Sequence, residues 1–111
     1  MDKVDFSSWE KINLVVAEIK KVEDIPGADK LYKLTLDVGN YGERIICAGI
    51  KHHYSKEELI NKKIIYFENL MPRKLKGIES QGMLLAATNE DHSKVILIVP
   101  DKNAENGWKI S

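Results

Sequence analysis

Residues 31–48, with the sequence LYKLTLDVGNYGERIICA, carry the clearest structural signal in the chain. Apolar side chains occupy every second position of the first half: Tyr32, Leu34, Leu36 and Val38. This alternation is typical of a β-strand with one face in a core. Residues 39–42 (GNYG) have the composition of a turn, and residues 44–48 return as a second strand. We therefore predict a β-hairpin here.

More segments of the chain have the composition of strands, separated by turns rich in Gly, Pro or Asn. They are residues 13–22, 63–68, 82–88 and 94–99, with a last short one over 108–110. Residues 69–80, which contain Pro72 and Gly77, are predicted to form a long loop.

Two short helices are expected. Ser55 and Glu58 have the spacing of a capping box, which predicts a helix after the third strand. One or two further helical turns are expected over residues 5–12, with Ser7 or Ser8 as the N-cap.

The order of these elements points to one fold class. No strand–helix alternation repeats along the chain, which disfavours a doubly wound parallel sheet and favours an all-β domain. Strands with one short helix between the third and the fourth match the oligonucleotide/oligosaccharide-binding (OB) fold, a five-stranded Greek-key barrel. We predict a single OB-fold domain over residues 1–111, with its core at about residues 12–100.

Composition narrows the possible functions. The 111 residues include 17 Lys or Arg, 17 Asp or Glu, three His and one Cys, so the formal net charge is zero. This balance excludes a nucleic-acid binder that is basic over its whole surface. One Cys forms no internal disulfide and is too little for a cysteine zinc site. A charged N-terminal sequence and short apolar runs predict no secretory signal and no membrane partner, so we expect a cytoplasmic protein.

Positive charge is nevertheless concentrated in residues 51–76, which carry seven basic and three acidic side chains. It is densest in three side chains of the expected loop: Arg73, Lys74 and Lys76. Arg binds a phosphate through two parallel hydrogen bonds, and Lys acts as a point charge. Ser80 offers a hydroxyl and Met83 a flexible, polarizable surface. From charge alone, a phosphate-binding loop and a merely solvated basic loop fit equally well.

No combination of residues has the pattern of a catalytic or metal site. His52 and His53 are adjacent, so on a strand they point to opposite faces and do not chelate one metal. Cys47 with His52 suggests a thiol nucleophile, but no third group to orient the base is evident, and an apolar strand does not favour a lowered thiol pKa. We expect no enzymatic activity, no metal and no cofactor.

Two blocks of the sequence resemble a known family. The first is residues 26–32, PGADKLY, and the second is residues 69–87, NLMPRKLKGIESQGMLLAA. The second is similar to the block N-L-x-P-x-K-x-x-G-x-x-S-x-G-M of the tRNA-binding domain family. That family includes the C-terminal appendix of methionyl-tRNA synthetases, free-standing dimeric proteins, and domains related to endothelial-monocyte-activating polypeptide. The resemblance extends over essentially the whole chain.

The resemblance implies an OB-fold module that binds tRNA by shape and backbone and assists aminoacylation without catalysing it. It implies that the chain is a beta subunit or a trans-acting appendix of methionyl-tRNA synthetase. The catalytic subunit of that synthetase is then a further candidate partner. The tRNA-contacting residues it implies are Asn69, Arg73, Lys74, Lys76, Ser80 and Met83, with Lys30 and Lys33. Met71 stands where the family commonly has Lys, which lowers the expected affinity.

A homodimer is also implied by the resemblance, because free-standing members pair through their N-terminal residues and C-terminal strands. Residues 1–11 and 101–111 are therefore expected to form dimer contacts. The candidate interface residues are Trp9, Trp108 and Ile110.

Two other functions remain open at this point. A peptide-binding chaperone of the CsaA type has the same expected fold and dimer, but resembles this chain less in the two blocks quoted above. A purely structural subunit that docks onto a synthetase catalytic chain would need no RNA contact at all.

Overall fold

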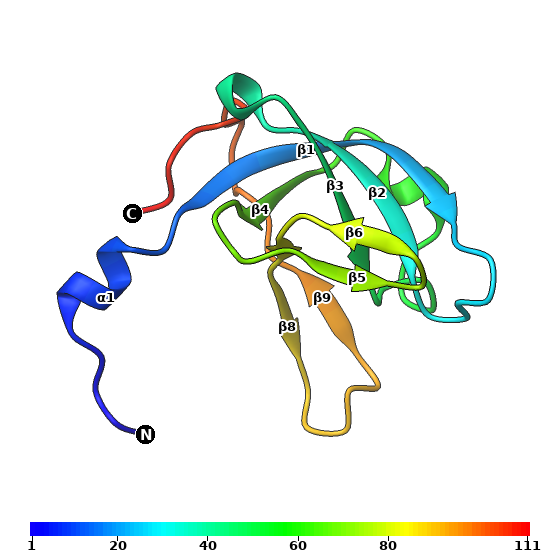
Figure 1. The fold of residues 1–111 in the computed structure, drawn as a ribbon, viewed down its shortest axis with the longest axis horizontal. Helices are drawn as coiled ribbons and strands as arrows, with labels where there is room; N and C mark the ends of the chain where they lie inside the picture. The colour runs from blue at the N-terminus through cyan, green and yellow to red at the C-terminus, as the bar shows by residue number, and fades with distance from the viewer.

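Five antiparallel strands form the main sheet of the computed structural model, which describes residues 1–111 (Figure 1). In spatial order they are β3 (Glu43–Ala48), β2 (Tyr32–Asp37), β1 (Leu14–Asp24), β4 (Lys63–Phe67) and β7 (Met83–Leu84). β2 and β3 pair over their full length, joined by the one-turn 3-10 helix η1 (Gly39–Tyr41). The hairpin predicted over residues 31–48 is confirmed.

β1 is long enough to pair with both of its neighbours, and this bends the sheet into a barrel. Its first half pairs with β4 and its second half with β2. The register with β2 shifts by one residue at Lys20, a β-bulge that bends the strand. On the far side, the Gln81 backbone N–H donates to Ile45 O and Gln81 Oε1 accepts from the Ile45 N–H, both at 2.8 Å. The barrel is therefore nearly closed, and the predicted all-β class is confirmed.

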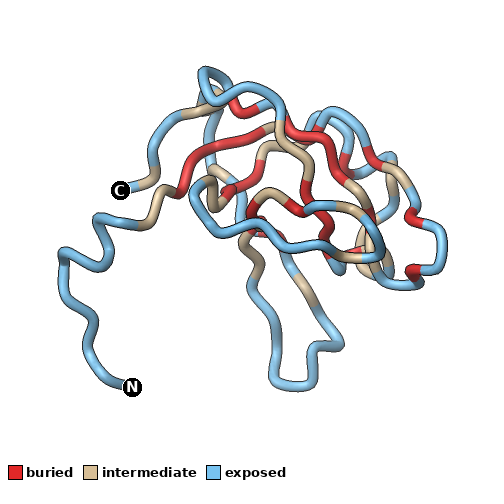
Figure 2. The backbone as a smooth tube through the Cα atoms, in the orientation of Figure 1, coloured by how far each residue is buried: buried red, intermediate tan, exposed pale blue.

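The barrel interior is filled by the alternating apolar side chains of these strands (Figure 2). Leu34 and Leu36 of β2 are fully buried, whereas Asp37 at the end of the strand is exposed. Tyr66 of β4 is the largest fully buried side chain. The core therefore sits where the period-two pattern places it.

The capping-box helix is confirmed as α2 (Lys56–Leu59), between β3 and β4. Ser55 Oγ accepts a hydrogen bond from the Glu58 N–H at 3.3 Å, and Glu58 Oε2 accepts one from the Ser55 N–H at 2.7 Å. Leu59 enters the barrel core. Both helices of the chain are short, and neither has the length and apolarity needed to cross a membrane.

The prediction of a long loop over residues 69–80 is wrong for most of that segment. It contains a second hairpin, made of β5 (Arg73–Leu75) and β6 (Ile78–Ser80). Its two turn residues, Lys76 and Gly77, both have positive φ, 51° and 83°, as a two-residue type I′ turn requires. Lys-Gly is not a dipeptide that marks such turns, and three-residue strands are too short for a periodic signal.

The strand expected over residues 82–88 is two strands, because the chain changes partners at Leu85. β7 pairs with β4, whereas β8 (Ala86–Thr88) pairs with β9 (Val95–Leu97). Figure 1 shows the β8–β9 hairpin projecting from the barrel. Leu85 links the two hairpin partners, because its N–H donates to Ile65 O at 3.1 Å and its O accepts from the Ile98 N–H at 3.0 Å.

The last predicted strand, residues 108–110, is reduced to a single bridge between Val15 and Lys109. Two backbone hydrogen bonds flank the bridge: Val16 N–H to Trp108 O at 2.9 Å and Ile110 N–H to Leu14 O at 2.8 Å. The C-terminal segment therefore lies along the start of β1.

The N-terminal helix is confirmed as α1 (Phe6–Glu10), but its predicted cap is wrong. Asp5 is the N-cap and makes no side-chain capping bond, while Ser7 and Ser8 lie inside the helix. The helix buries none of its residues and stands away from the barrel (Figures 1 and 2).

Candidate nucleic-acid interface

A small apolar cluster, separate from the barrel core, holds the β5–β6 hairpin in place. Its buried members are Ile25, Ala28 and Cys47, with Leu31, Leu75 and Ile78 packed against them. Leu75 and Ile78 are cross-strand partners next to the hairpin turn, so this face of the hairpin is covered by the loop between β1 and β2. Lys74 and Glu79, the next pair, are both exposed because adjacent strand positions point to opposite faces.

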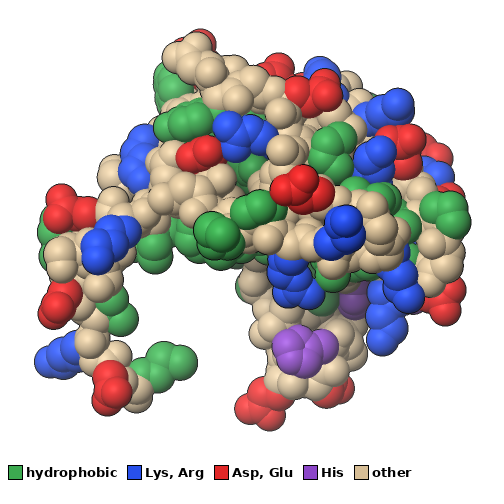
Figure 3. Space-filling model, in the orientation of Figure 1, with side chains coloured by type: hydrophobic (Ala, Val, Ile, Leu, Met, Phe, Trp, Pro, Cys, Tyr) green, Lys and Arg blue, Asp and Glu red, His purple; other side chains and the backbone are tan.

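Five basic side chains surround this cluster. They are Lys30 and Lys33 on one side, and Arg73, Lys74 and Lys76 on the hairpin. None of the five takes part in an ion pair, whereas Lys51 and Lys56 share Asp24 at 3.1 and 2.9 Å. Figure 3 shows Lys and Arg side chains gathered over and beneath the region of the hairpin. The structure thus brings together five of the eight predicted contact residues.

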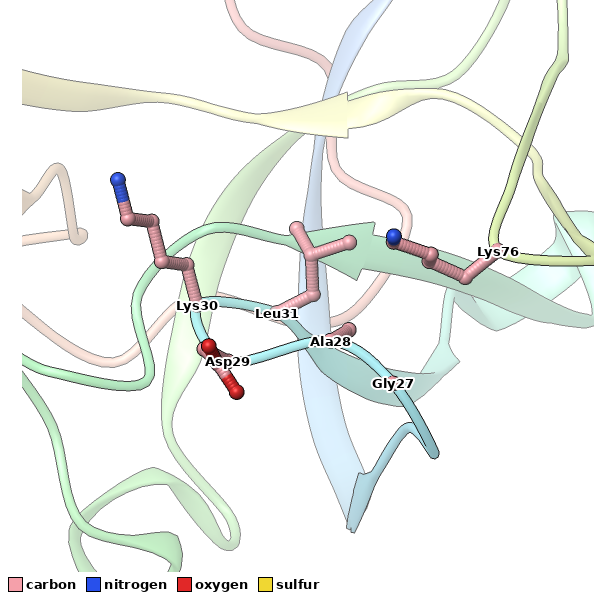
Figure 4. A pocket seen from close by; sticks show the side chains of 6 residues that line it. All are labelled: Gly27, Ala28, Asp29, Lys30, Leu31 and Lys76. Atoms are coloured by element: carbon pink, nitrogen blue, oxygen red, sulfur yellow. The ribbon is translucent and has the colours of Figure 1, made fainter.

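A cavity of about 270 Å³ opens between this hairpin and the loop before β2 (Figure 4). Its lining is Gly27, Ala28, Asp29, Lys30, Leu31 and Lys76. In Figure 4, Lys30 and Lys76 stand on either side of the Leu31 side chain, while the Asp29 carboxylate points the opposite way. The mouth of the cavity is therefore positively charged and its floor is apolar.

Ser80, predicted as a contact residue, is only 2% exposed. Its Oγ accepts a hydrogen bond from the Cys47 N–H at 3.0 Å and donates one to Gly82 O at 3.2 Å. The hydroxyl thus ties the hairpin to β3 and has no free path to a ligand. A loop was expected here from the sequence, and a loop prediction does not say which side chains point inward. Ser80 was therefore expected at the surface.

Asn69 and Met83 lie at the base of the hairpin and not at its cationic tip. Asn69 Oδ1 accepts from the Asn13 N–H at 2.8 Å, and its Nδ2 donates to Lys11 O at 2.7 Å. Met83 is half-buried in β7, paired with Phe67 of β4. Asn69 therefore positions the chain between α1 and β1, which the sequence pattern did not reveal.

A polar network that lies beside Asn69 was not predicted from the sequence. Arg44 donates to Glu68 Oε2 at 2.9 Å, and Asn13 Nδ2 donates to Glu68 Oε1 at 2.9 Å. The hydrogen bond from Asn13, followed by that from Arg44, lowers the pKa of Glu68. The bond to Glu68 in turn raises the pKa of Arg44. Arg44 stays charged, but its charge is balanced by Glu68, so it does not add to the unpaired cations of the hairpin.

The chemistry available at this surface is that of cations. No three His, Cys, Asp or Glu side chains lie together as a metal site would need. Burial raises the pKa of the Cys47 thiol, and the nearby Lys33 only partly opposes this. The Cys47 thiol therefore stays protonated and is a poor nucleophile. The five basic side chains around the hairpin are chemically suited to holding phosphate groups.

The chain ends carry exposed apolar side chains. Phe6 is 71%, Trp9 38% and Trp108 53% exposed. Ile110 is half-buried against a second small cluster on the outer side of β1 and β4. The predicted interface residues thus lie at two ends of the chain that meet near the start of β1.

Residues 14–109 match the family model described as "Putative tRNA binding domain". The chain belongs to the tRNA-binding domain family. The matched residues of this tRNA-binding domain include the whole barrel, the β5–β6 hairpin and every residue of the cavity. The resemblance seen in residues 26–32 and 69–87 is confirmed.

The chain spans less than a fifth of the length of the methionine–tRNA ligases that it matches. It is 52% identical over 111 residues to the methionine–tRNA ligase of Caldanaerobacter subterraneus subsp. tengcongensis. That match covers 100% of this chain but 17% of the ligase. The similarity therefore concerns one small segment of that enzyme.

Solved structures similar to the tRNA-binding domain include a MetRS-related protein and a chaperone. A MetRS-related protein from Pyrococcus horikoshii is 40% identical, with a TM-score of 0.92 and 100% coverage of both chains. The CsaA chaperone protein from Picrophilus torridus is 36% identical, with a TM-score of 0.89, covering 98% of this chain and 100% of that one. The fold is thus common to a MetRS-related protein and a CsaA chaperone protein.

Proposed function

We propose that this chain is a non-catalytic tRNA-binding module that assists aminoacylation in the cytoplasm. The observation that carries the proposal is the group of five basic side chains without acidic partners around the β5–β6 hairpin, in a chain of the tRNA-binding domain family. The match to a small segment of a methionine–tRNA ligase supports a link to that enzyme, as its beta subunit or trans-acting appendix.

The proposed contacts are mainly to phosphates. Arg73 supplies a planar fork, and Lys30, Lys33, Lys74 and Lys76 supply point charges. Phosphate contacts fix position without reading sequence, so many tRNAs are suitable ligands. Met83 stays a candidate contact, while Ser80 and Asn69 serve by building the frame of the hairpin.

Salt dependence is the first test of this proposal. If about four of the five cations contact phosphates, the logarithm of the association constant falls with the logarithm of salt concentration at a slope near −3. Titration of a tRNA transcript at several salt concentrations measures this slope. A complex that is insensitive to salt would contradict the proposed contacts.

A substitution of Glu79 should strengthen tRNA binding and so tests the proposal in the opposite direction. Glu79 lies directly across from Lys74 on the exposed face of the hairpin, so its carboxylate opposes an approaching phosphate. We expect Glu79→Gln to tighten tRNA binding about threefold to tenfold at low salt. The matched control is Glu90→Gln, an exposed carboxylate at the end of the β8–β9 hairpin, which should leave the affinity unchanged. Equal effects of the two variants would show that only net charge matters.

The proposal includes a homodimer formed by the chain ends. A five-residue helix is too short to be stable without packing, yet α1 buries none of its residues within the chain. The exposed Phe6 and Trp9 of the N-terminal segment and the exposed Trp108 of the C-terminal segment supply apolar surface that a second copy would cover. Two copies would also present two hairpins to one RNA, which increases the effective affinity.

Loss of the dimer is the corresponding prediction. We expect the wild-type chain to have twice the monomer mass by light scattering, and the double variant Trp9→Ala, Trp108→Ala to shift to monomer at micromolar concentration. Met71→Ala is the control, because Met71 is 82% exposed but lies at the start of the hairpin. A wild-type monomer, or a double variant that stays dimeric, would refute the assigned interface.

A peptide-binding chaperone is the second candidate function, and the similarity to the CsaA structure is the observation that favours it. Competition separates the two functions. If tRNA binding is the function, an excess of unfolded peptide leaves the tRNA complex intact. Displacement of tRNA by micromolar peptide would favour the chaperone.

A further inference from the structure

We infer that the cavity between the loop before β2 and the hairpin tip receives one unpaired nucleotide of the bound RNA. Its phosphate lies between Lys30 and Lys76, and its base rests on Leu31. The inference rests on the proposed tRNA binding and goes beyond it, because it adds a base-sized site to a surface that otherwise contacts phosphates.

The lining of the cavity combines the two chemistries of a nucleotide. Lys30 and Lys76 come from segments far apart in the sequence, and both lack an acidic partner. Leu31 stands between them, and the Asp29 carboxylate points away from them (Figure 4). A phosphate is attracted to the two ammonium groups, and the flat face of a base covers the apolar side chain.

The size of the cavity limits what can enter. At about 270 Å³ it lies near the lower end of small-molecule sites. It accommodates a single nucleotide and not a longer stretch of strand. The ligand is therefore one nucleotide of an RNA whose remaining phosphates lie along the hairpin.

The site is preformed by packing. Ala28 and Leu31 from its wall and floor belong to the same apolar cluster as Leu75 and Ile78 beside the turn. Lys76 follows Leu75 directly, so this cluster fixes the distance between the two sides of the cavity. Binding thus requires little ordering of the protein, which favours affinity.

The nucleotide must be unpaired. In a duplex, both faces of a base are stacked on neighbours, so no face is available to Leu31. An unstacked base in a loop or bulge exposes a face that an apolar side chain can cover. The cavity therefore favours RNA that has loop nucleotides over RNA that is fully paired.

Abasic RNA tests this inference, because it lacks bases but keeps every phosphate. An RNA stem-loop and the same stem-loop with abasic loop nucleotides are titrated against the wild-type chain, Leu31→Ala and the control Leu70→Ala. We expect the wild type and Leu70→Ala to prefer the intact loop about fivefold, and Leu31→Ala to bind both RNAs equally. Leu31→Met, which keeps the side-chain volume, should restore the preference.

The outcomes separate this inference from the proposed function. If the wild type binds neither RNA, the nucleotide site is refuted, whereas the titration with a tRNA transcript decides the proposed tRNA binding separately. If it binds both RNAs equally, or if Leu31→Ala keeps the preference, tRNA binding stands and the nucleotide site is refuted. The wild-type comparison alone decides the question should Leu31→Ala prove unstable.

Discussion

Replacing Arg73, Lys74 and Lys76 together by Ala should abolish the gel shift of a tRNA. All three side chains are exposed, and none has an acidic ion-pair partner. Their charge is therefore available to phosphates. Losing three charge-assisted contacts is expected to weaken binding about a hundredfold and to reduce the salt slope to about −1.

The control for this triple variant removes the same charge elsewhere. Lys21, Lys94 and Lys102 are exposed and lie outside the hairpin, so their joint replacement by Ala should leave most of the affinity. Both triple variants should keep the wild-type circular dichroism and thermal midpoint, because surface charges contribute little to stability. A gel shift that survives in the hairpin variant would show that the RNA binds another surface.

Gly82→Ala should destabilise the barrel more than any surface change. Gly82 has φ +107°, and a Cβ at this position would lie 2.3 Å from Phe67 O and 2.8 Å from the Tyr66 ring. The Tyr66 hydroxyl donates to Gln81 O, so the crowding falls on the residues that close the barrel. Backbone strain and overpacking together should cost about 4 kcal/mol, which lowers the thermal midpoint by about 15 °C.

Gly27→Ala is the matched control for Gly82→Ala. Gly27 also has a positive φ, +79°, but a Cβ there meets no atom within 4 Å. Only the conformational penalty applies, about 1 kcal/mol, so the midpoint should fall by about 5 °C. Equal midpoints for the two variants would contradict the packing that the structure assigns to Gly82.

Elements with strong local signals were predictable from the sequence. The alternation from Tyr32 to Val38 gave the β2–β3 hairpin, and the spacing of Ser55 and Glu58 gave α2. Both depend on contacts between residues close in the chain, which local physical rules describe well. Arg73, Lys74 and Lys76 were identifiable from the local concentration of positive charge, whereas Lys30 and Lys33 were identified only through the family resemblance.

Features that depend on distant contacts were not predictable. The β5–β6 hairpin was read as a loop because its turn places Lys76 at a positive φ that few non-glycine residues adopt. The inward direction of Ser80 follows from pairing with β3, a partner more than thirty residues away. The break at Leu85 arises from a change of partner strands and leaves no mark on the apolar run that contains it.

The separate apolar cluster beneath the hairpin has a consequence for how such a protein diverges. Leu75 and Ile78 anchor the hairpin, while Lys74 and Glu79 on its other face contribute nothing to that anchor. Natural selection can therefore adjust the charge of the outer face, residue by residue, at almost no cost in folding. Descendants of one ancestral barrel are free to acquire strong or weak RNA affinity, or a different ligand, while the scaffold stays the same.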